Sequence, residues 1–179
     1  AMRDQGIIKQ QRDYSCGAAS IATLLSYFYL DSISEEEVLH YMGEENSKSA
    51  TMFSMQAALD KIGYQALGLS LTYSQLTELK APAIAFLNLE SNGHFTVLKG
   101  ANARSVALAD PSMGNVSMSK ERFESLWSDE QNGKLGKVML VRPKAKSFRT
   151  SGTLFTANPQ RHTDFVESNL STQGTLHRY

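Results

Sequence analysis

Three residue types that can break a peptide bond are spaced along the chain in a suggestive order. Cys16, the only cysteine, stands at the head of the apolar run "SCGAASIATLL". A helix N-terminus stabilises a thiolate, because its N–H groups are unpaired and carry a partial positive charge. The neighbouring Gly17 would let a substrate backbone approach closely. A cysteine at a helix start is more often inert, so position alone does not make Cys16 a nucleophile.

A thiol nucleophile needs a base, and the base needs an acceptor that orients it. His94 opens the predicted strand "HFTVLKG" just after the predicted turn Ser91-Asn92-Gly93, and Asp110 ends the next predicted strand, "SVALAD". If these strands form a hairpin, the two side chains lie at the same end of the sheet. Taken singly, His94 is typical of an exposed residue beside a turn, and Asp110 before a proline is typical of turn initiation.

Acyl chemistry at a thiol also needs hydrogen-bond donors for the oxyanion that develops. The backbone N–H of Cys16 is one candidate. The side-chain amide of Gln10 is the second, provided that the segment bends back towards the helix start, and Gln11 is the adjacent alternative. Alone, either glutamine is typical of a polar surface.

Composition limits the other possibilities. The chain has 179 residues, of which 41% are hydrophobic and 20% charged, which is enough for one globular domain with a core. A formal net charge of zero gives no reason to expect nucleic acid or an anionic membrane as a partner. No apolar run approaches the roughly 18 residues that span a bilayer. One cysteine excludes an intramolecular disulfide.

The histidines other than His94 are weaker candidates. His40 lies in a surface-type helix, and His162 and His177 lie in the polar C-terminal region. The four histidines and single cysteine form no cluster of the spacing that holds structural zinc. We therefore expect no metal and no cofactor.

The order of the predicted elements favours an α+β fold. Helices are predicted over residues 16–29, 34–42, 51–63 and 72–79, with Ser15, Ser34, Thr51 and Thr72 as N-caps; Ser34 with Glu37 and Thr72 with Gln75 have the pattern of capping boxes. Strands follow over 82–90, 94–100, 105–110 and 136–143, with a loop over 111–115 and one more helix over 120–127, capped by Ser119. Helices followed by an antiparallel sheet indicate N-terminal helices packed on that sheet.

The composition changes at about Ala145. Residues 145–179 are rich in Ser, Thr, Asn, Gln and Gly, and their few apolar residues have no sustained period. We expect a domain over residues 1–144 and a polar tail over 145–179 that is weakly ordered or wraps on the domain or a partner.

Taken together, "QQRDYSCGAASIATLL", "HFTVLKG" and "ADPSMG" resemble the papain-like cysteine peptidases, and more narrowly the bacteriocin-leader (double-glycine leader) peptidase family. The resemblance covers about residues 6 to 143 and includes the order of the motifs. It implies a papain-like fold in which Cys16 is the nucleophile, His94 the general base, Asp110 the orienting acceptor and Gln10 the oxyanion donor.

The resemblance also implies a substrate. Family members cleave after a Gly-Gly leader, or Gly-Ala in some cases, in a small bacterial precursor peptide. A narrow cleft that admits only residues without side chains would explain this preference. The upstream part of the leader would bind as an amphipathic helix, for which exposed apolar residues of the helix over 51–63 are candidates.

Several alternatives stay open at this point. Family members occur as free-standing proteins and as domains of ABC transporters, but no transporter sequence is present here, so a link to an export system is only an expectation. An exported, periplasmic location is expected, with the cytoplasm as the alternative. The same residues could serve an acyl or peptidyl transferase, and a relative without catalysis would only bind leaders. The presence of Cys16, His94 and Asp110 together argues against the binding module, and analysis of the products would separate hydrolysis from transfer.

Overall fold

The computed structural model describes residues 3–12, 14–43, 50–89 and 93–159. Helices and strands alternate more than the sequence pattern predicts. The elements in chain order are α1 (Cys16–Tyr27), α2 (Glu35–Met42), α3 (Met52–Ile62), β1 (Tyr64–Leu71), α4 (Tyr73–Leu76), β2 (Ala83–Leu87), β3 (His94–Ala101), β4 (Ser105–Asp110), β5 (Gly114–Ser119), α5 (Lys120–Trp127), β6 (Ser128–Asp129), the 3-10 turn η1 (Glu130–Asn132) and β7 (Leu135–Pro143).

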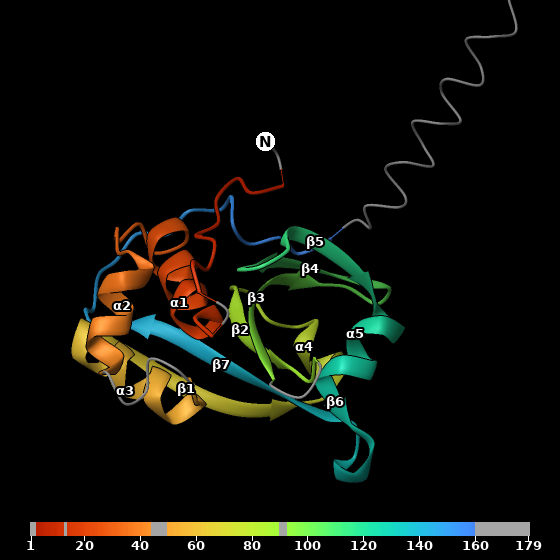
Figure 1. The fold of residues 1–179 in the computed structure, drawn as a ribbon. Helices are drawn as coiled ribbons and strands as arrows, with labels where there is room; N and C mark the ends of the chain where they lie inside the picture. Colours follow the sequence, from red (N-terminus) through yellow and green to blue (C-terminus); the bar gives the residue numbers. More distant parts are fainter. Residues whose placement is uncertain (1–2, 13, 44–49, 90–92, 160–179) are drawn as a thin grey trace, which may run out of the picture.

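One antiparallel sheet organises the domain. Its strands lie in the order β1-β7-β2-β3-β4-β5, with the short β6 paired to β7. The last strand in sequence therefore lies between β1 and β2 (Figure 1). Strands β2, β3, β4 and β5 are consecutive neighbours, each paired with the next. This confirms the predicted hairpin between residues 94–100 and 105–110.

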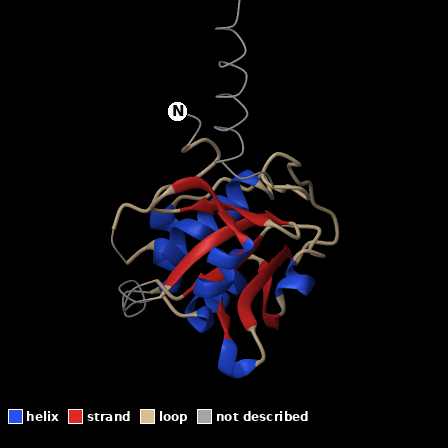
Figure 2. Cartoon of the chain, turned by 90° about the vertical axis from the view of Figure 1, so that its right-hand side faces the viewer, coloured by secondary structure: helices blue, strands red, loops and turns tan. Residues whose placement is uncertain are grey.

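The helices cover the two faces of the sheet. Helices α1, α2 and α3 pack against one face, around a core that includes Ile21, Leu24, Met55, Ile84 and Val97. Helices α4 and α5 pack against the other face, around Phe123, Trp127, Leu76, Leu98 and Leu108. Figure 2 shows the strands in red running between blue helices. The predicted α+β class with N-terminal helices on an antiparallel sheet is confirmed.

The beginnings of the helices follow local sequence signals, with one exception. Ser34, Thr51 and Thr72 each accept a hydrogen bond from the third residue of their helix, and Ser119 caps α5 in the same way. Ser15 precedes α1 but its side chain makes no cap hydrogen bond. Its hydroxyl instead donates to the carbonyl of Arg12. The predicted capping role of Ser15 is therefore wrong.

Three strands were not predicted from the sequence. β1 follows α3 directly and pairs with β7 along its whole length, from Tyr64 opposite Pro143 to Leu71 opposite Gly136. β5 occupies residues that the pattern assigns to a loop and a helix cap, and β6 is a two-residue extension beside β7. β1 and β5 are the edge strands of the sheet. Buried and exposed residues do not alternate regularly along β1, so its sequence lacks the two-residue period of a strand. The predicted turn at Ser91-Asn92 lies outside the described residues.

Residues 145–159 lie across the domain and contact it at several points. The Ser151 N–H donates to the Phe28 carbonyl, Leu154 is buried in the core that α1, α2 and α3 share with the sheet, and the Thr156 N–H donates to the Lys99 carbonyl. Residues 160–179 lie outside the described part, so the boundary at residue 144 stays a prediction. Within the described ranges, no helix has the length and apolar character needed to cross a bilayer.

Candidate active site

The thiol of Cys16 lies at the first turn of α1. The residue is 9% exposed and unpaired with any other cysteine. Because the Ser15 hydroxyl turns away to Arg12, it does not cap the first N–H groups of this helix. The backbones of Phe95 on β3 and of Gly17 hydrogen-bond the sulfur. The sequence thus begins a helix with a cysteine and leaves the positive end of that helix for the thiolate.

His94 and Asp110 meet at one end of the sheet, as the hairpin geometry predicts. His94 is the first residue of β3 and Asp110 the last residue of β4, and the two strands are antiparallel neighbours. His94 Nε2 lies 2.7 Å from Asp110 Oδ2, with the histidine side chain 13% exposed and the carboxylate fully buried. The other ring nitrogen, Nδ1, is then available to the Cys16 thiol, which hydrogen-bonds the imidazole.

The carboxylate of Asp110 is held on both oxygens. Oδ1 accepts hydrogen bonds from the Ser112 N–H at 2.9 Å, the Ser112 hydroxyl at 2.8 Å and the Met113 N–H at 2.9 Å. Oδ2 is left for His94. Burial opposes the charge, but the hydrogen bond and the positive charge of His94 outweigh it and hold the pKa of Asp110 well below its ordinary range. The turn after β4 thereby fixes the direction in which the carboxylate points.

The thiol and the imidazole stabilise each other as an ion pair. Burial of Cys16 disfavours its thiolate, yet the hydrogen bond and charge of His94, together with backbone donors, lower the pKa of the thiol. Burial also disfavours the imidazolium, but Asp110 and then Cys16 raise the pKa of His94 to about 9. Both shifts favour a thiolate beside an imidazolium, which is the reactive form of a cysteine nucleophile.

Gln10 lies next to the aspartate turn. Its backbone N–H donates to the Pro111 carbonyl at 2.9 Å. Its Nε2 donates to the Arg12 carbonyl at 2.8 Å, while its Oε1 is buried without a hydrogen-bond partner among the described residues. Gln11 is exposed, and its backbone N–H donates to Glu35. Of the two glutamines, Gln10 is the one held beside the residues of the site.

The other histidines take no part in this arrangement. His40 is exposed in α2 and its ring contacts the ring of Tyr41. His162 and His177 lie outside the described residues. In the described ranges, no group of three or more His, Cys, Asp or Glu side chains could hold a metal ion.

Sequence reasoning did not find two of the features that shape the site. One is the hydroxyl of Ser112, in the predicted loop after Asp110. Nothing in the residues around Ser112 indicated that its hydroxyl would bond the Asp110 carboxylate. Gly93 lies against the ring of Phe86: an added Cβ would be 2.2 Å from Phe86 Cζ. Gly17 also has a packing role, because a Cβ there would lie 2.9 Å from Ala50 Cβ. Its small size fits the contact with the segment before α3.

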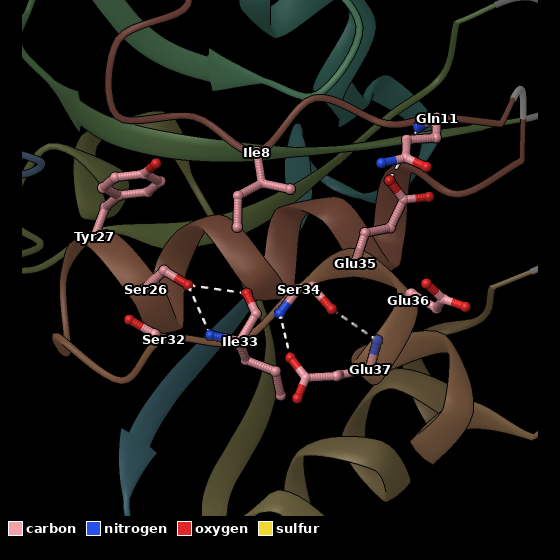
Figure 3. A pocket seen from close by; sticks show the side chains of 10 residues that line it. All are labelled: Ile8, Gln11, Ser26, Tyr27, Ser32, Ile33, Ser34, Glu35, Glu36 and Glu37. Atoms are coloured by element: carbon pink, nitrogen blue, oxygen red, sulfur yellow. Dashed lines mark hydrogen bonds between the residues drawn. The ribbon is translucent and has the colours of Figure 1, made fainter.

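A pocket of about 490 Å³ lies beside α1, on the side that faces the start of α2. Figure 3 shows Gln11 and Glu35 at one end of it and Tyr27 at the other. None of Cys16, His94 and Asp110 lines this pocket. Its lining residues are Ile8, Gln11, Ser26, Tyr27, Ser32, Ile33, Ser34, Glu35, Glu36 and Glu37.

Comparison with known proteins agrees with this geometry. The sequence model of the peptidase C39 family matches residues 4–132. The chain belongs to the peptidase C39 family. The resemblance to double-glycine leader peptidases and the papain-like α+β fold are thereby confirmed.

A curated C39 relative is the probable functional amyloid protease FapD of Pseudomonas fluorescens, which is 29% identical over 132 residues. The match covers 70% of this chain and 58% of the relative, so the chain spans less than two thirds of that protein.

Two solved structures share the C39 fold. The peptidase domain of Streptococcus ComA, a bifunctional ABC transporter of a quorum-sensing pathway, superposes with a TM-score of 0.65 at 20% identity, covering 76% of this chain and 97% of that one. The double-glycine motif protease of an AMS/PCAT transporter, solved in complex with its leader peptide, gives 0.62 at 26% identity, covering 76% and 90%.

Proposed function

We propose that this C39 chain is a cysteine endopeptidase that cleaves a small precursor peptide after a Gly-Gly type leader. The observation that carries the proposal is the hydrogen-bonded series from the Cys16 thiol through His94 to the buried Asp110. A thiol at a helix start, an imidazole and an orienting carboxylate are the groups that hydrolysis through an acyl-enzyme requires. The likeness to a double-glycine motif protease supports the choice of substrate.

In the proposed reaction, the Cys16 thiolate attacks the carbonyl carbon of the second glycine. The C–N bond breaks as the His94 imidazolium gives its proton to the leaving amine, and a thioester remains on Cys16. Neutral His94 then takes a proton from a water molecule, which attacks the thioester and releases the leader with a free carboxyl group. Asp110 keeps the ring oriented through Nε2 in both steps.

We assign the oxyanion donors to the Cys16 N–H and the side chain of Gln10. The N-cap residue Ser15 makes no side-chain hydrogen bond to α1, so it does not compete for the first N–H groups of the helix. The Gln10 amide now donates to Arg12, and the buried position is taken by Oε1. A half-turn of the amide would bring Nε2 to that buried position. From there the amide N–H could donate to an oxyanion, because an amide nitrogen donates where the amide oxygen only accepts.

The leader upstream of the glycines would dock as a helix on exposed apolar side chains. Phe53, near the start of α3, is 80% exposed. A phenylalanine this exposed leaves apolar area in water that a helical peptide can bury. We therefore assign Phe53 to leader binding. Association with an export system and a periplasmic location stay predictions.

The direct test uses two synthetic peptides that differ at one place, a leader ending in Gly-Gly and the same leader ending in Val-Val. Mass spectrometry of the products should show a single cut after the second glycine in the first peptide, with water as the acyl acceptor. Cys16→Ala should abolish the cut while leaving the circular dichroism spectrum of the native fold unchanged. Cleavage by Cys16→Ala at the original rate, or equal cleavage of both peptides, would contradict the proposal.

A further inference from the structure

The segment that precedes the nucleophile grips the turn that carries the aspartate. Residues Arg3–Gln10, here called the arm, run beside residues 110–115 (Figure 1). Three successive carbonyl groups of the turn each accept a hydrogen bond from the arm. The pairs are Gln10 N–H to Pro111 O at 2.9 Å, Lys9 Nζ to Ser112 O at 2.8 Å and Arg3 Nε to Met113 O at 2.7 Å.

The turn also donates back to the arm. The Asn115 N–H donates to the Arg3 carbonyl at 2.5 Å, and Asn115 Nδ2 donates to the Gln5 carbonyl at 2.9 Å. Gly114 has φ +85°, and a Cβ there would lie 2.6 Å from the Arg3 carbonyl oxygen. Only a glycine allows both this backbone conformation and this close approach. Five hydrogen bonds thus join two short segments that are about a hundred residues apart in the chain.

The same turn supplies three hydrogen bonds to the second oxygen of Asp110. The Ser112 N–H, the Ser112 hydroxyl and the Met113 N–H all point inward to Oδ1, while the carbonyls of Ser112 and Met113 point outward to the arm. A peptide group is planar, so fixing a carbonyl on one side also fixes the N–H of the next residue on the other. The Lys9 bond to the Ser112 carbonyl therefore orients the N–H of Met113.

We propose that the arm is a positioning element for the His94–Asp110 pair: by holding the carbonyls of the turn, it keeps Ser112 and Met113 on Asp110 Oδ1 and so aims Oδ2 at His94. Arg3 and Lys9 are positioning residues that do not touch the reacting atoms. The proposal rests on the proposed roles of His94 and Asp110, because it says how those roles are maintained.

The test compares the double variant Arg3→Ala/Lys9→Ala with a matched control, Lys144→Ala. Lys9 bonds the Ser112 carbonyl and pairs with the Asp4 carboxylate at 3.2 Å. Lys144 likewise bonds one backbone carbonyl and one carboxylate, both of Asp60, and its side chain is 43% exposed against 39% for Lys9. The measurement is the rate of iodoacetamide alkylation of Cys16 as a function of pH. Since Cys16 is the only thiol, the profile reports the thiolate–imidazolium pair without any peptide substrate.

The double variant should lower the alkaline inflection, at which His94 loses its proton, by about half a pH unit or more, because a misaligned carboxylate supports the imidazolium less well. At pH values above that inflection this corresponds to about a threefold loss of imidazolium. Lys9→Arg in place of Lys9→Ala keeps a donor for the Ser112 carbonyl. The inflection should then return most of the way to its wild-type pH. Lys144→Ala should leave the profile unchanged.

The sign of the shift separates positioning from simple electrostatics. Removing two positive charges near a histidine raises its pKa, whereas losing the aligned carboxylate lowers it. An unchanged inflection, or one that moves upward, would overturn the proposal. If the double variant lacks the native circular dichroism spectrum, the single variant Lys9→Ala is judged by the same criterion. Failure of the wild-type protein to cut a Gly-Gly peptide would reject the proposed function and leave this alkylation test standing.

Discussion

Replacing Asp110 by asparagine tests the electrostatic basis of the site. The variant keeps the shape of the side chain and an oxygen for the Ser112 and Met113 donors, but it removes the negative charge from a fully buried position. His94 lies 2.7 Å from that charge, and its pKa is raised to about 9 against the opposing effect of burial. With the charge gone, burial favours the neutral imidazole.

The magnitude follows from the pKa of His94. The rise from 6.5 to about 9 is worth ~3.4 kcal/mol at 1.36 kcal/mol per unit. Burial opposes this rise, so Asp110 and Cys16 together contribute more than the net ~3.4 kcal/mol, and Asp110 is the larger contributor. We expect His94 in Asp110→Asn to titrate about two pH units lower. The thiolate then loses its partner at neutral pH, and peptide cleavage should fall by about 10²-fold or more while remaining above that of Cys16→Ala.

The assay is an NMR titration of the imidazole ring protons in both proteins, with Asp31→Asn as the control. Asp31 also accepts a side-chain hydrogen bond, from Tyr64, but it has no contact with His94. Because the pKa of His94 is raised on folding, its stabilisation is fully present below pH 6.5 and is lost as the pH rises through about 9. The difference in free energy of unfolding between wild type and Asp110→Asn should shrink over that range. A His94 pKa within ~0.5 unit of wild type in the variant would refute the reasoning.

Three further substitutions have definite expected outcomes. Gly93→Ala forces the Phe86 ring to move, which should lower the free energy of unfolding in urea by about 1–3 kcal/mol. It should also lower the activity, because His94 is the next residue, and a fully active variant would show that this contact is dispensable. Leu154→Ala opens a cavity in the core that α1, α2 and α3 share with the sheet and should cost about 2–5 kcal/mol while leaving the alkylation profile of Cys16 intact. Phe53→Ala should raise KM for a full-length leader peptide and leave kcat nearly unchanged; an equal effect on a peptide without the helical part would argue against leader binding at this site.

The starts of most helices could be predicted because their signals are local. A hydroxyl at the N-cap and a partner three residues on, as in Ser34 with Glu37 or Thr72 with Gln75, satisfy orphan N–H groups wherever the helix lies. Ser15 has the same residue type but bonds Arg12 instead, because the preceding segment folds back on itself. That difference depends on tertiary structure, and it leaves the helix start free for the thiol.

The strands β1 and β5 were not predicted, for a different reason. β1 and β5 form the two edges of the sheet, and both contain Gly and Ser, residues that are poor strand formers. Their extended conformation is imposed by pairing with β7 and β4, which are far stronger strands. A residue pattern read along the chain contains no information about the partner that a strand will find.

The part of the site that depends on a local connection was predictable, and the part that depends on long-range contacts was not. His94 and Asp110 belong to a hairpin, so their closeness follows from the short connection between β3 and β4. The docking of Cys16 against β3 is a long-range contact that the spacing alone does not define, and the family resemblance supplied it. The contact of the arm with the turn could not be predicted from the sequence. The arm bonds mainly backbone carbonyls, and every residue has one, so no residue type marks the contact.

The position of β7 has a consequence for how the protein comes into being during translation. The strand that separates β1 from β2 is made last, at residues 135–143, so β1 has no strand partner until almost the whole domain has left the ribosome. At about 5–20 residues per second, the chain from Cys16 to the end of β7 takes on the order of 10 seconds to synthesise. During that interval the sheet is incomplete. Because domains generally fold as units, we expect the complete fold around Cys16, His94 and Asp110 to form only after β7 has been made.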